Sequence, residues 1–403
     1  MLMLLFVSDL HLTDRKERSS FSTDIFVRRL EEVLQAAVAE GVTKIELVLL
    51  GDILEMLKSK QWLADNVRPW EPLTTQHENT VAKIANDIFD SNADFFASLR
   101  RLRDQYPLTV SYYPGNHDLP INTEMGKGSR RKLRELLDIA PGDDRYFLPN
   151  FDDSEHGVTG VHGHHWDRSN RYLHGMCAAG DFVVIDVITR LPGVLAMHLQ
   201  MDENDPSLDF AHQIDDVIPQ TVNAMATWLV EGIDRLTRIH GPRALRNATG
   251  RIAEELEHRM RGKRFESKLG SWWVKILKRV IPHLVGRVEL IRPVRWLTSP
   301  KLPAPKNLVE EAHEDLIKAG EKTEYILFGH THIPEYRTIA GTPVRRYLNI
   351  GTWRRAHRRA DVAHRKAGAF VTTNVGAIAI IRSSEEARAT KLPRHELRQF
   401  FYV

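Results

Sequence analysis

Five short polar blocks, most of them directly after an apolar run, constrain the fold of this chain more than any other feature. The blocks read Ser-Asp-Leu-His at 8–11, Gly-Asp-Ile-Leu-Glu at 51–55, Gly-Asn-His-Asp at 115–118, Val-His-Gly-His-His at 161–165 and Gly-His-Thr-His at 329–332. Short apolar runs that end at Gly or Pro are typical of buried strands. Because α/β sheets bind ligands at the carboxyl ends of their strands, we expect all five blocks to meet at one crevice.

The blocks share Asp, Asn and His side chains and contain no sulfur ligand. Taken singly, an Asp after a strand usually forms a turn or caps a helix, and a buried His is usually a hydrogen-bonded core residue. Their repetition in order favours a metal site instead. Together they supply ligands for two divalent cations, the usual equipment for attacking a phosphate ester with water. The mixture of imidazole and carboxylate suits Mn, Fe, Zn or Ni better than Mg or Ca, and we favour manganese.

In this order the patterns D-x-H, G-D-x-x-E, G-N-H-D, H-G-H and G-H-x-H resemble those of the calcineurin-like metallophosphoesterase superfamily. The resemblance covers residues 1–167 and 324–353. It implies that one cation is held by three residues, a second cation by three more, and that one carboxylate bridges both. These ligands would be Asp9, His11 and His332 for the first cation, Asn116, His162 and His330 for the second, and Asp52 for the bridge.

The resemblance also implies a mechanism, in which a bridging water or hydroxide attacks phosphorus. His117 would stabilise the developing charge or protonate the leaving group, and Asp118 would orient His117. A further set of residues near the blocks could contact the ligands or the substrate, although its two histidine-block residues could equally be surface residues and its basic residues could equally decorate a solvated helix start. This set comprises His164, Asp167, Lys127, Arg130 and Arg131.

The sequence predicts an α/β fold, because apolar strand-like runs alternate with helical patterns over 23–40 and 81–104. Alternation of this kind predicts parallel strands. From the resemblance we expect a two-sheet β-sandwich flanked by helices, built from residues 1–167 and 324–403. Two further strands are predicted at 370–373 and 377–381.

Residues 168–323 separate the fourth block from the fifth, and are called the insertion below. They are predicted to form a mostly helical cap, with helices over 211–239, 244–260 and 308–318 and an extended connector over 299–305. Within it, residues 268–297 combine an apolar helical stripe with Trp, Lys and Arg. This pattern is compatible with peripheral membrane contact, but an ordinary amphipathic helix docked on the core is favoured.

Composition narrows the class of protein. The chain has 403 residues, a net charge of +3 and a single cysteine, Cys177. The low net charge implies no global polyanion partner, although the arginines at 354, 355, 358 and 359 form either a polyanion surface or a solvated loop. One cysteine excludes an internal disulfide framework and fits a reducing, cytoplasmic location. Neither a signal peptide nor an apolar run of membrane-spanning length is expected, and the oligomeric state is left open.

The favoured function is a metal-dependent phosphohydrolase that cleaves a phosphoester, phosphodiester or pyrophosphate bond. The H-G-H block and the cap are similar to the UDP-2,3-diacylglucosamine pyrophosphohydrolase branch, whose substrate is a lipid-linked nucleotide. The longer insertion and the histidine of the third block depart from that branch, so a cyclic nucleotide or another small phosphodiester is an equally compatible substrate. A nuclease of the SbcD type is an alternative that the near-neutral charge disfavours. A non-catalytic scaffold is disfavoured because no expected ligand is missing.

Overall fold

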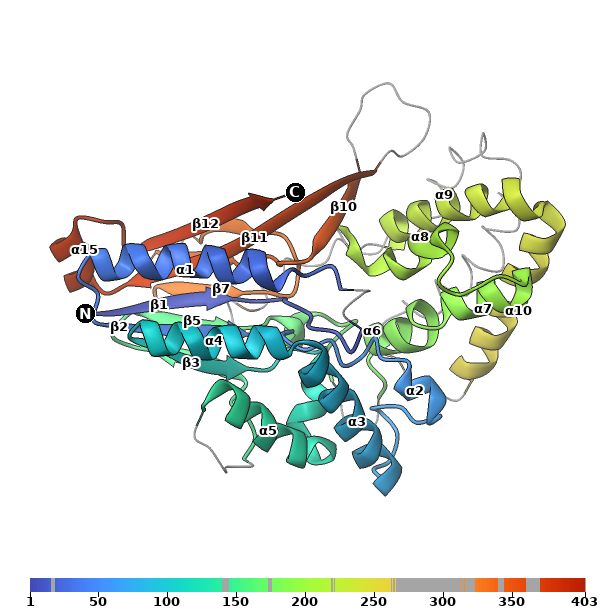
Figure 1. The fold of residues 1–403 in the computed structure, drawn as a ribbon, viewed down its shortest axis with the longest axis horizontal. Coiled ribbons are helices and arrows are strands. Elements are labelled where there is room, and N and C mark those ends of the chain that lie inside the picture. Colours follow the sequence, from blue (N-terminus) through green and yellow to red (C-terminus); the bar gives the residue numbers. More distant parts are fainter. Residues whose placement is uncertain are drawn as a thin grey trace.

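The computed structural model shows an α/β protein with two mixed sheets (Figure 1). Figure 1 shows the sheets and their flanking helices at one end and a helical lobe, which belongs to the insertion, at the other. The structure describes residues 1–15, 19–139, 145–172, 176–218, 220, 222–261, 263, 265, 312, 315, 323–339, 344–359 and 370–402.

The larger sheet has the strand order β3-β2-β1-β11-β10-β6, with β12 paired to β11. Its strands are β1 (Leu2–Val7), β2 (Lys44–Leu50), β3 (Leu108–Tyr113), β6 (Val217–Ile218), β10 (Arg355–Arg359), β11 (Phe370–Arg382) and β12 (His395–Tyr402). Strands β1, β2 and β3 are parallel, as their alternation with helices predicts. The two short strands expected at 370–373 and 377–381 are one long strand, β11, which pairs antiparallel with β1, β10 and β12.

The smaller sheet has the order β4-β5-β7-β9-β8. Its strands are β4 (Asn150–Asp153), β5 (Val158–Val161), β7 (Tyr325–Phe328), β8 (Glu335–Ile339) and β9 (Arg345–Asn349). Strands β5 and β7 are parallel neighbours, although the insertion separates them in sequence. The insertion therefore leaves the sheet after β5 and returns at the adjacent strand.

A buried apolar layer lies between the two sheets. Leu4, Phe6 and Leu50 from the larger sheet cluster with Phe151 and Leu327 from the smaller one. The rings of Phe6 and Phe151 meet edge to face with centroids 5.2 Å apart. Because side chains alternate along a strand, the other face of β1 packs against the flanking helices, so β1 is buried on both faces and is continuously apolar.

The helices before the smaller sheet are α1 (Thr23–Ala39), α2 (Gln61–Ala64), α3 (Thr75–Ser91), α4 (Ala93–Gln105) and α5 (Lys127–Leu137). Helix α1 matches its prediction: Ser22 caps its start, and the chain turns at Gly41, where φ is +83°. The single helix predicted over 81–104 is wrong, because the chain breaks at Asn92 into α3 and α4. The Asn92 amide donates to the carbonyls of Thr13 and Ile88, a local alternative to continued helix.

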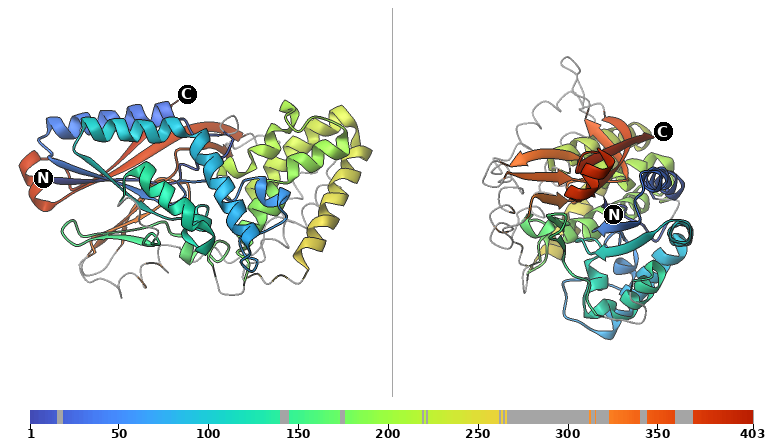
Figure 2. Two further views of the ribbon diagram at one scale, coloured as in Figure 1. Left: turned by 60° about the horizontal axis from the view of Figure 1, so that its bottom comes forward. Right: turned by 90° about the vertical axis from the view of Figure 1, so that its left-hand side faces the viewer.

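The described part of the insertion forms the helical lobe, which has its own apolar core (Figure 2). Its main elements are α6 (Ala179–Phe182), the π-helical turn Val183–Ile188, α7 (Leu191–Leu199), α8 (Asp209–His212), α9 (Val222–His240) and α10 (Pro242–Met260). The helix predicted over 244–260 is confirmed, but that over 211–239 is interrupted by strand β6. Residues 268–297 and 299–305, and all of 308–318 except Ala312 and Asp315, lie outside the described residues.

One helical stretch of the lobe contradicts the expectation that no apolar run reaches membrane-spanning length. Among the described residues, Ala179–Leu199 is long and apolar enough to cross a membrane by length and composition. However, 72% of its most apolar window is buried inside the protein. Its apolar side chains are part of the core of the lobe, and a buried core helix meets the same length and hydropathy criteria.

The apolar layer between the two sheets leads to a prediction about the free energy of unfolding. Replacing Phe6 with Ala should lower the free energy of unfolding by about 3 to 5 kcal/mol, because it leaves a cavity in that layer. The matched control is Phe401→Ala on β12, whose side chain is 73% exposed; the expected change is within about 0.5 kcal/mol. Urea unfolding followed by tryptophan fluorescence measures both, and equal losses would contradict the packing described.

Candidate metal centre

The five sequence blocks meet at the carboxyl ends of β1, β2, β3, β5 and β7, as expected. Three ligand atoms of Asp9, His11 and His332 lie within 4.8 Å of one another, and so do those of Asp52, His162 and His330. His11 Nε2 lies 3.8 Å from Asp52 Oδ2 and links the two groups. The six side chains that converge belong to strands far apart in the sequence.

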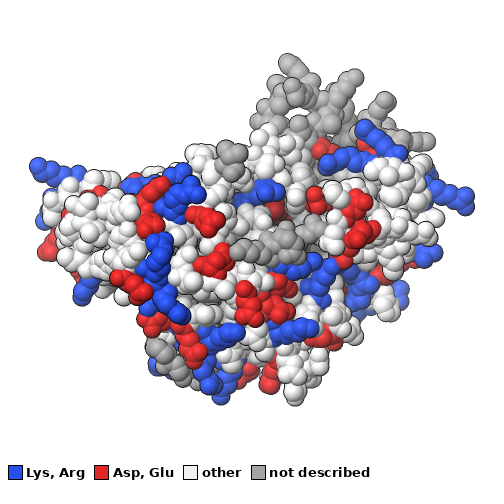
Figure 3. Space-filling model, viewed as in Figure 1, with Lys and Arg blue, Asp and Glu red and all other residues white. Residues whose placement is uncertain are grey.

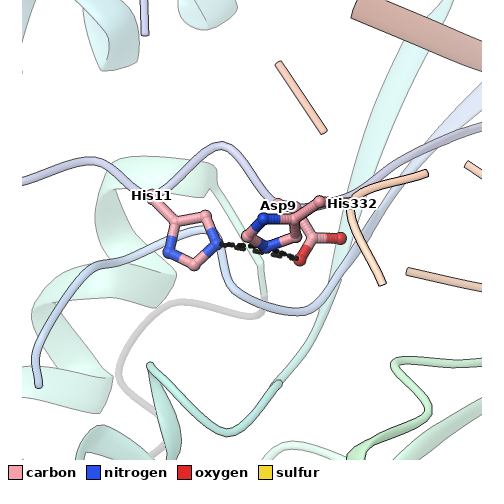
Figure 4. Close-up of side chains that lie close together, drawn as sticks. All are labelled: Asp9, His11 and His332. Carbon is pink, nitrogen blue, oxygen red and sulfur yellow. Dashed lines mark hydrogen bonds and ion pairs between the residues drawn. The ribbon is translucent and has the colours of Figure 1, made fainter. Parts of the chain in front are cut away.

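In the first group, the three side chains point toward one another (Figure 4). Asp9 Oδ1 is 3.1 Å from His332 Nε2 and 3.7 Å from His11 Nε2, and the two histidine nitrogens are 3.1 Å apart. All three residues are buried. Burial lowers the pKa of His332, so its imidazole is held neutral, the form that binds metal ions.

In the second group, Asp52 Oδ2 lies 3.1 Å from His162 Nε2. Asn116 belongs to the same place, because its neighbours on both sides contact Asp52. The His117 backbone N–H donates to Asp52 Oδ1 over 2.8 Å, and a Cβ atom on Gly115 would lie 2.1 Å from the same oxygen. The glycine is therefore required for the close approach of the third block to the second.

Two observations test whether these donors fit cations. Asp9 Oδ1 and Asn116 Oδ1 are buried and accept no hydrogen bond, which is costly unless another partner satisfies them. Burial lowers the pKa of His162, but the charges of Asp52 and Asp9 outweigh it and raise the pKa to about 9. The centre therefore stabilises positive charge, and its nitrogen and oxygen donors fit a divalent cation in each group.

The backbone at these blocks is unusual. Nine non-glycine residues in the described part of the chain have positive φ, and five of them are predicted ligands. These five are Asp9 (56°), His11 (49°), Asp52 (53°), His330 (67°) and His332 (59°). Left-handed backbone is uncommon outside glycine and is concentrated at functional sites. The chain turns abruptly at the ends of β1, β2 and β7, which directs the ligands into one space.

Glu55, the last residue of the second block, was not predicted to have a role. Its Oε2 lies 2.8 Å from His11 Nδ1, and its Oε1 lies 2.8 Å from His117 Nδ1. By holding Nδ1 of His11, it directs Nε2 toward Asp9 and His332, as carboxylates behind metal-bound histidines do. The sequence feature that could have identified Glu55 is its position three residues after Asp52 in the second block.

His117 lies between Glu55 and Asp52. Burial lowers its pKa, but the negative charges of Glu55 and Asp52 outweigh this effect and raise the pKa to about 10. The side chain is therefore positively charged at neutral pH. The imidazolium beside the two ligand groups carries a proton, but a pKa of about 10 holds that proton more tightly than the near-neutral pKa of an efficient general acid does.

The orienting role predicted for Asp118 is wrong. Its carboxylate accepts hydrogen bonds from the backbone N–H groups of Ile53 and Gly115 and so ties together the loops that carry Asp52 and Asn116. Glu55, not Asp118, holds the His117 ring. Burial and the charge of Asp52 raise the pKa of Asp118 to about 6.

The outer residues divide into two sets. Asp167 Oδ2 lies 3.0 Å from His330 Nε2, and the His164 ring lies 5.6 Å from that of His162, so both adjoin the second group. Arg130, by contrast, is buried and donates to the carbonyls of Ile121 and Thr123, so it is neither a substrate contact nor part of a solvated helix start. Lys127 and Arg131 are exposed on α5.

Comparison with known protein families and with curated proteins finds no match for this chain. The resemblance to calcineurin-like metallophosphoesterases therefore stays a prediction from the five blocks.

The centre generates a prediction about metal content. Replacing Asp52 with Asn removes the charge that lies between the two groups, so the purified protein should lose bound divalent cation from both. The matched control is Asp90→Asn, whose side chain is 80% exposed; its metal content should equal that of the wild type. Plasma mass spectrometry after dialysis against manganese measures both, and full retention in Asp52→Asn would contradict the bridging position.

Proposed function

We propose that this protein is a dinuclear-metal-dependent phosphohydrolase of the calcineurin-like type. The observation that carries the proposal is the position of the charged His117 beside two adjoining groups of ligands, all buried except the half-buried His330, which are joined through His11 and Asp52. One group alone is compatible with a structural ion. Two groups with a proton donor beside them are typical of hydrolytic centres.

The residues that would hold the cations are those of the two groups. Asp9, His11 and His332 belong to the first; Asn116, His162 and His330 belong to the second, and Asp52 stands between them. When bound, two adjacent cations lower the pKa of water and stabilise charge on the oxygens of a phosphate ester.

The protein's own side chains supply the other parts of the reaction. Glu55 keeps His117 protonated, and the His117 backbone N–H on Asp52 Oδ1 fixes its place beside the bridging carboxylate. From there His117 donates its proton to the leaving oxygen. Asp167 holds Nε2 of His330 and so fixes the orientation of that ring.

Surface charge favours a small substrate over a nucleic acid. Basic and acidic side chains are interspersed on the face shown in Figure 3, which displays no single extended basic surface. Arg354 is one of the four arginines that could have formed a surface for a polyanion or a solvated loop. It is instead buried and paired with Asp215 and Asp216, so it belongs to neither. A small phosphate ester or diester is therefore proposed, with a lipid-linked nucleotide as the more specific alternative.

The test is hydrolysis of phosphate esters by the purified protein with manganese, iron, zinc, nickel or magnesium. The panel comprises bis-p-nitrophenyl phosphate, p-nitrophenyl phosphate, an alkyl phosphodiester, a UDP-linked lipid and duplex DNA. Diester turnover with manganese is expected. Replacing His117 with Ala should lower kcat by about 10²- to 10⁴-fold, as loss of a general acid does.

The leaving group makes this test specific for proton donation. The loss should be larger for the alkyl ester than for the p-nitrophenyl ester, because p-nitrophenolate departs without a proton. The control is His258→Ala, an exposed histidine of α10, which should retain wild-type turnover. Equal losses on both esters would exclude the proton-donor role, and no turnover with any metal would refute the proposed function.

A further inference from the structure

Arg354 connects the insertion to the candidate metal centre. It follows β9 in the chain and is 6% exposed. Its Nη2 donates to Asp215 Oδ2 over 2.6 Å and also to Asp216 Oδ1, two carboxylates of the insertion. On its other side, Nη1 lies 4.0 Å from Glu55 Oε2. One guanidinium therefore lies between the insertion and the carboxylate that holds His11 and His117.

Lys58 makes a second connection of the same kind. Its Nζ donates to Asp215 Oδ1 over 2.6 Å and to the His212 carbonyl over 2.9 Å, both in the insertion. Its backbone N–H donates to Glu55 Oε1 over 3.1 Å. A cavity of about 30 Å³ is lined by His11 and Glu55 from the candidate metal centre and by Lys58 and Arg354, among others. The Arg354 guanidinium and the Lys58 ammonium therefore share Asp215, and Glu55 contacts the Arg354 guanidinium and the Lys58 backbone.

The two residues before Arg354 hold the first ligand group from behind. Thr352 Oγ1 donates to the Asp9 carbonyl over 2.7 Å, and the Trp353 N–H donates to the same oxygen over 3.3 Å. The stretch from Thr352 to Arg354 therefore contacts both the backbone of one ligand and the partner of another. A displacement of Arg354 would therefore disturb both the backbone of Asp9 and the carboxylate of Glu55.

The insertion is fixed to the sheet at this point and is not merely laid over it. Strand β6, directly after Asp216, pairs in parallel with His357 and Arg358 of β10. Trp228 of α9 stacks on His357 with ring centroids 4.4 Å apart. Apolar packing and strand pairing already hold this part of the insertion. The buried ion cluster is a costly addition, because desolvation of buried charges can exceed their attraction.

We propose that the buried cluster of Lys58, Asp215, Arg354 and Asp216 is a positioning device through which the insertion fixes Glu55 and, with it, His11 and His117. The cluster makes the insertion part of the catalytic unit. The claim about turnover rests on the proposed function; the claim about metal affinity and backbone protection at the first ligand group does not.

The experiment compares the wild type with the double variant Asp215→Asn/Asp216→Asn, which removes the insertion's charges from Arg354 and Lys58. Manganese affinity is measured by calorimetric titration, and backbone protection of residues 8–12 by amide hydrogen exchange. The expected result is an affinity lower by about 10- to 100-fold, the usual effect of losing partners behind metal ligands, with faster exchange at residues 8–12. In turnover, kcat should fall while KM changes little.

The matched control is Asp186→Asn. Asp186 is equally buried in the insertion and pairs with Arg68 over 2.8 Å, so its loss also breaks a buried ion pair between the insertion and the rest of the protein. It has no described contact with Glu55. This variant should lose thermal stability but keep wild-type manganese affinity and wild-type exchange at residues 8–12.

A second pair of variants separates positioning from folding. Arg354→Lys keeps one positive charge, whereas Arg354→Met keeps only the length, so Lys should recover part of the affinity that Met loses. The proposal is overturned if the double variant is destabilised like Asp186→Asn while its manganese affinity and its exchange at residues 8–12 match the wild type. Absence of turnover in the wild type would refute the proposed function alone, because affinity and exchange still decide the positioning role.

Discussion

The buried carboxylate of Asp52 is the group on which the rest of the structure depends. A carboxylate removed from water is stable only with positive or hydrogen-bonding partners around it. Asp52 has such partners from three other blocks: the rings of His11 and His162, and the backbone N–H of His117. Each partner comes from a different strand end, so the two sheets must place these ends together for the carboxylate to be satisfied.

The chain packs so closely around Asp52 that only certain residue types fit at the neighbouring positions. Gly115 has no room for a side chain because of Asp52 Oδ1, and a Cβ atom on Gly51 would lie 2.4 Å from His162 Nδ1. The left-handed backbone at the ligands is the other consequence, because a strand that continued straight would direct its last side chains to the two faces of the sheet. Local strain at the strand ends is balanced by the apolar layers on both sides of β1, which hold the strands in register.

A second level of contacts surrounds the ligands and determines their orientation. Glu55 holds two histidines, Asp167 holds a third, and Asp118 joins the loops of two blocks. Arg354 and Lys58 extend this level into the insertion. The ligand groups, the sheets and the insertion are therefore linked by contiguous polar contacts, although the sheets and the insertion have separate apolar cores.

Much of this arrangement was predictable from local sequence. The strands β1, β2, β3, β5 and β7, the helix α1, the parallel pairing of the first three strands and the convergence of the blocks all follow from apolar runs, turn residues and alternation. The break at Asn92, the merging of the last strand candidates into β11 and the strand inside the insertion were not predictable. Each depends on a partner remote in sequence: the Thr13 carbonyl, strand β1 and strand β10.

The sequence by itself determined which donors meet, because the repetition of Asp, Asn and His after several strands predicts which side chains share one edge of the sheets. Only the tertiary structure decided how those donors are oriented. Asp118 adjoins His117 in the chain yet binds two backbone N–H groups, while Glu55, from another strand end, holds the ring. The direction of a side chain depends on the backbone angles at its position and on the partners across the space it enters, and neither is encoded in the spacing of a motif.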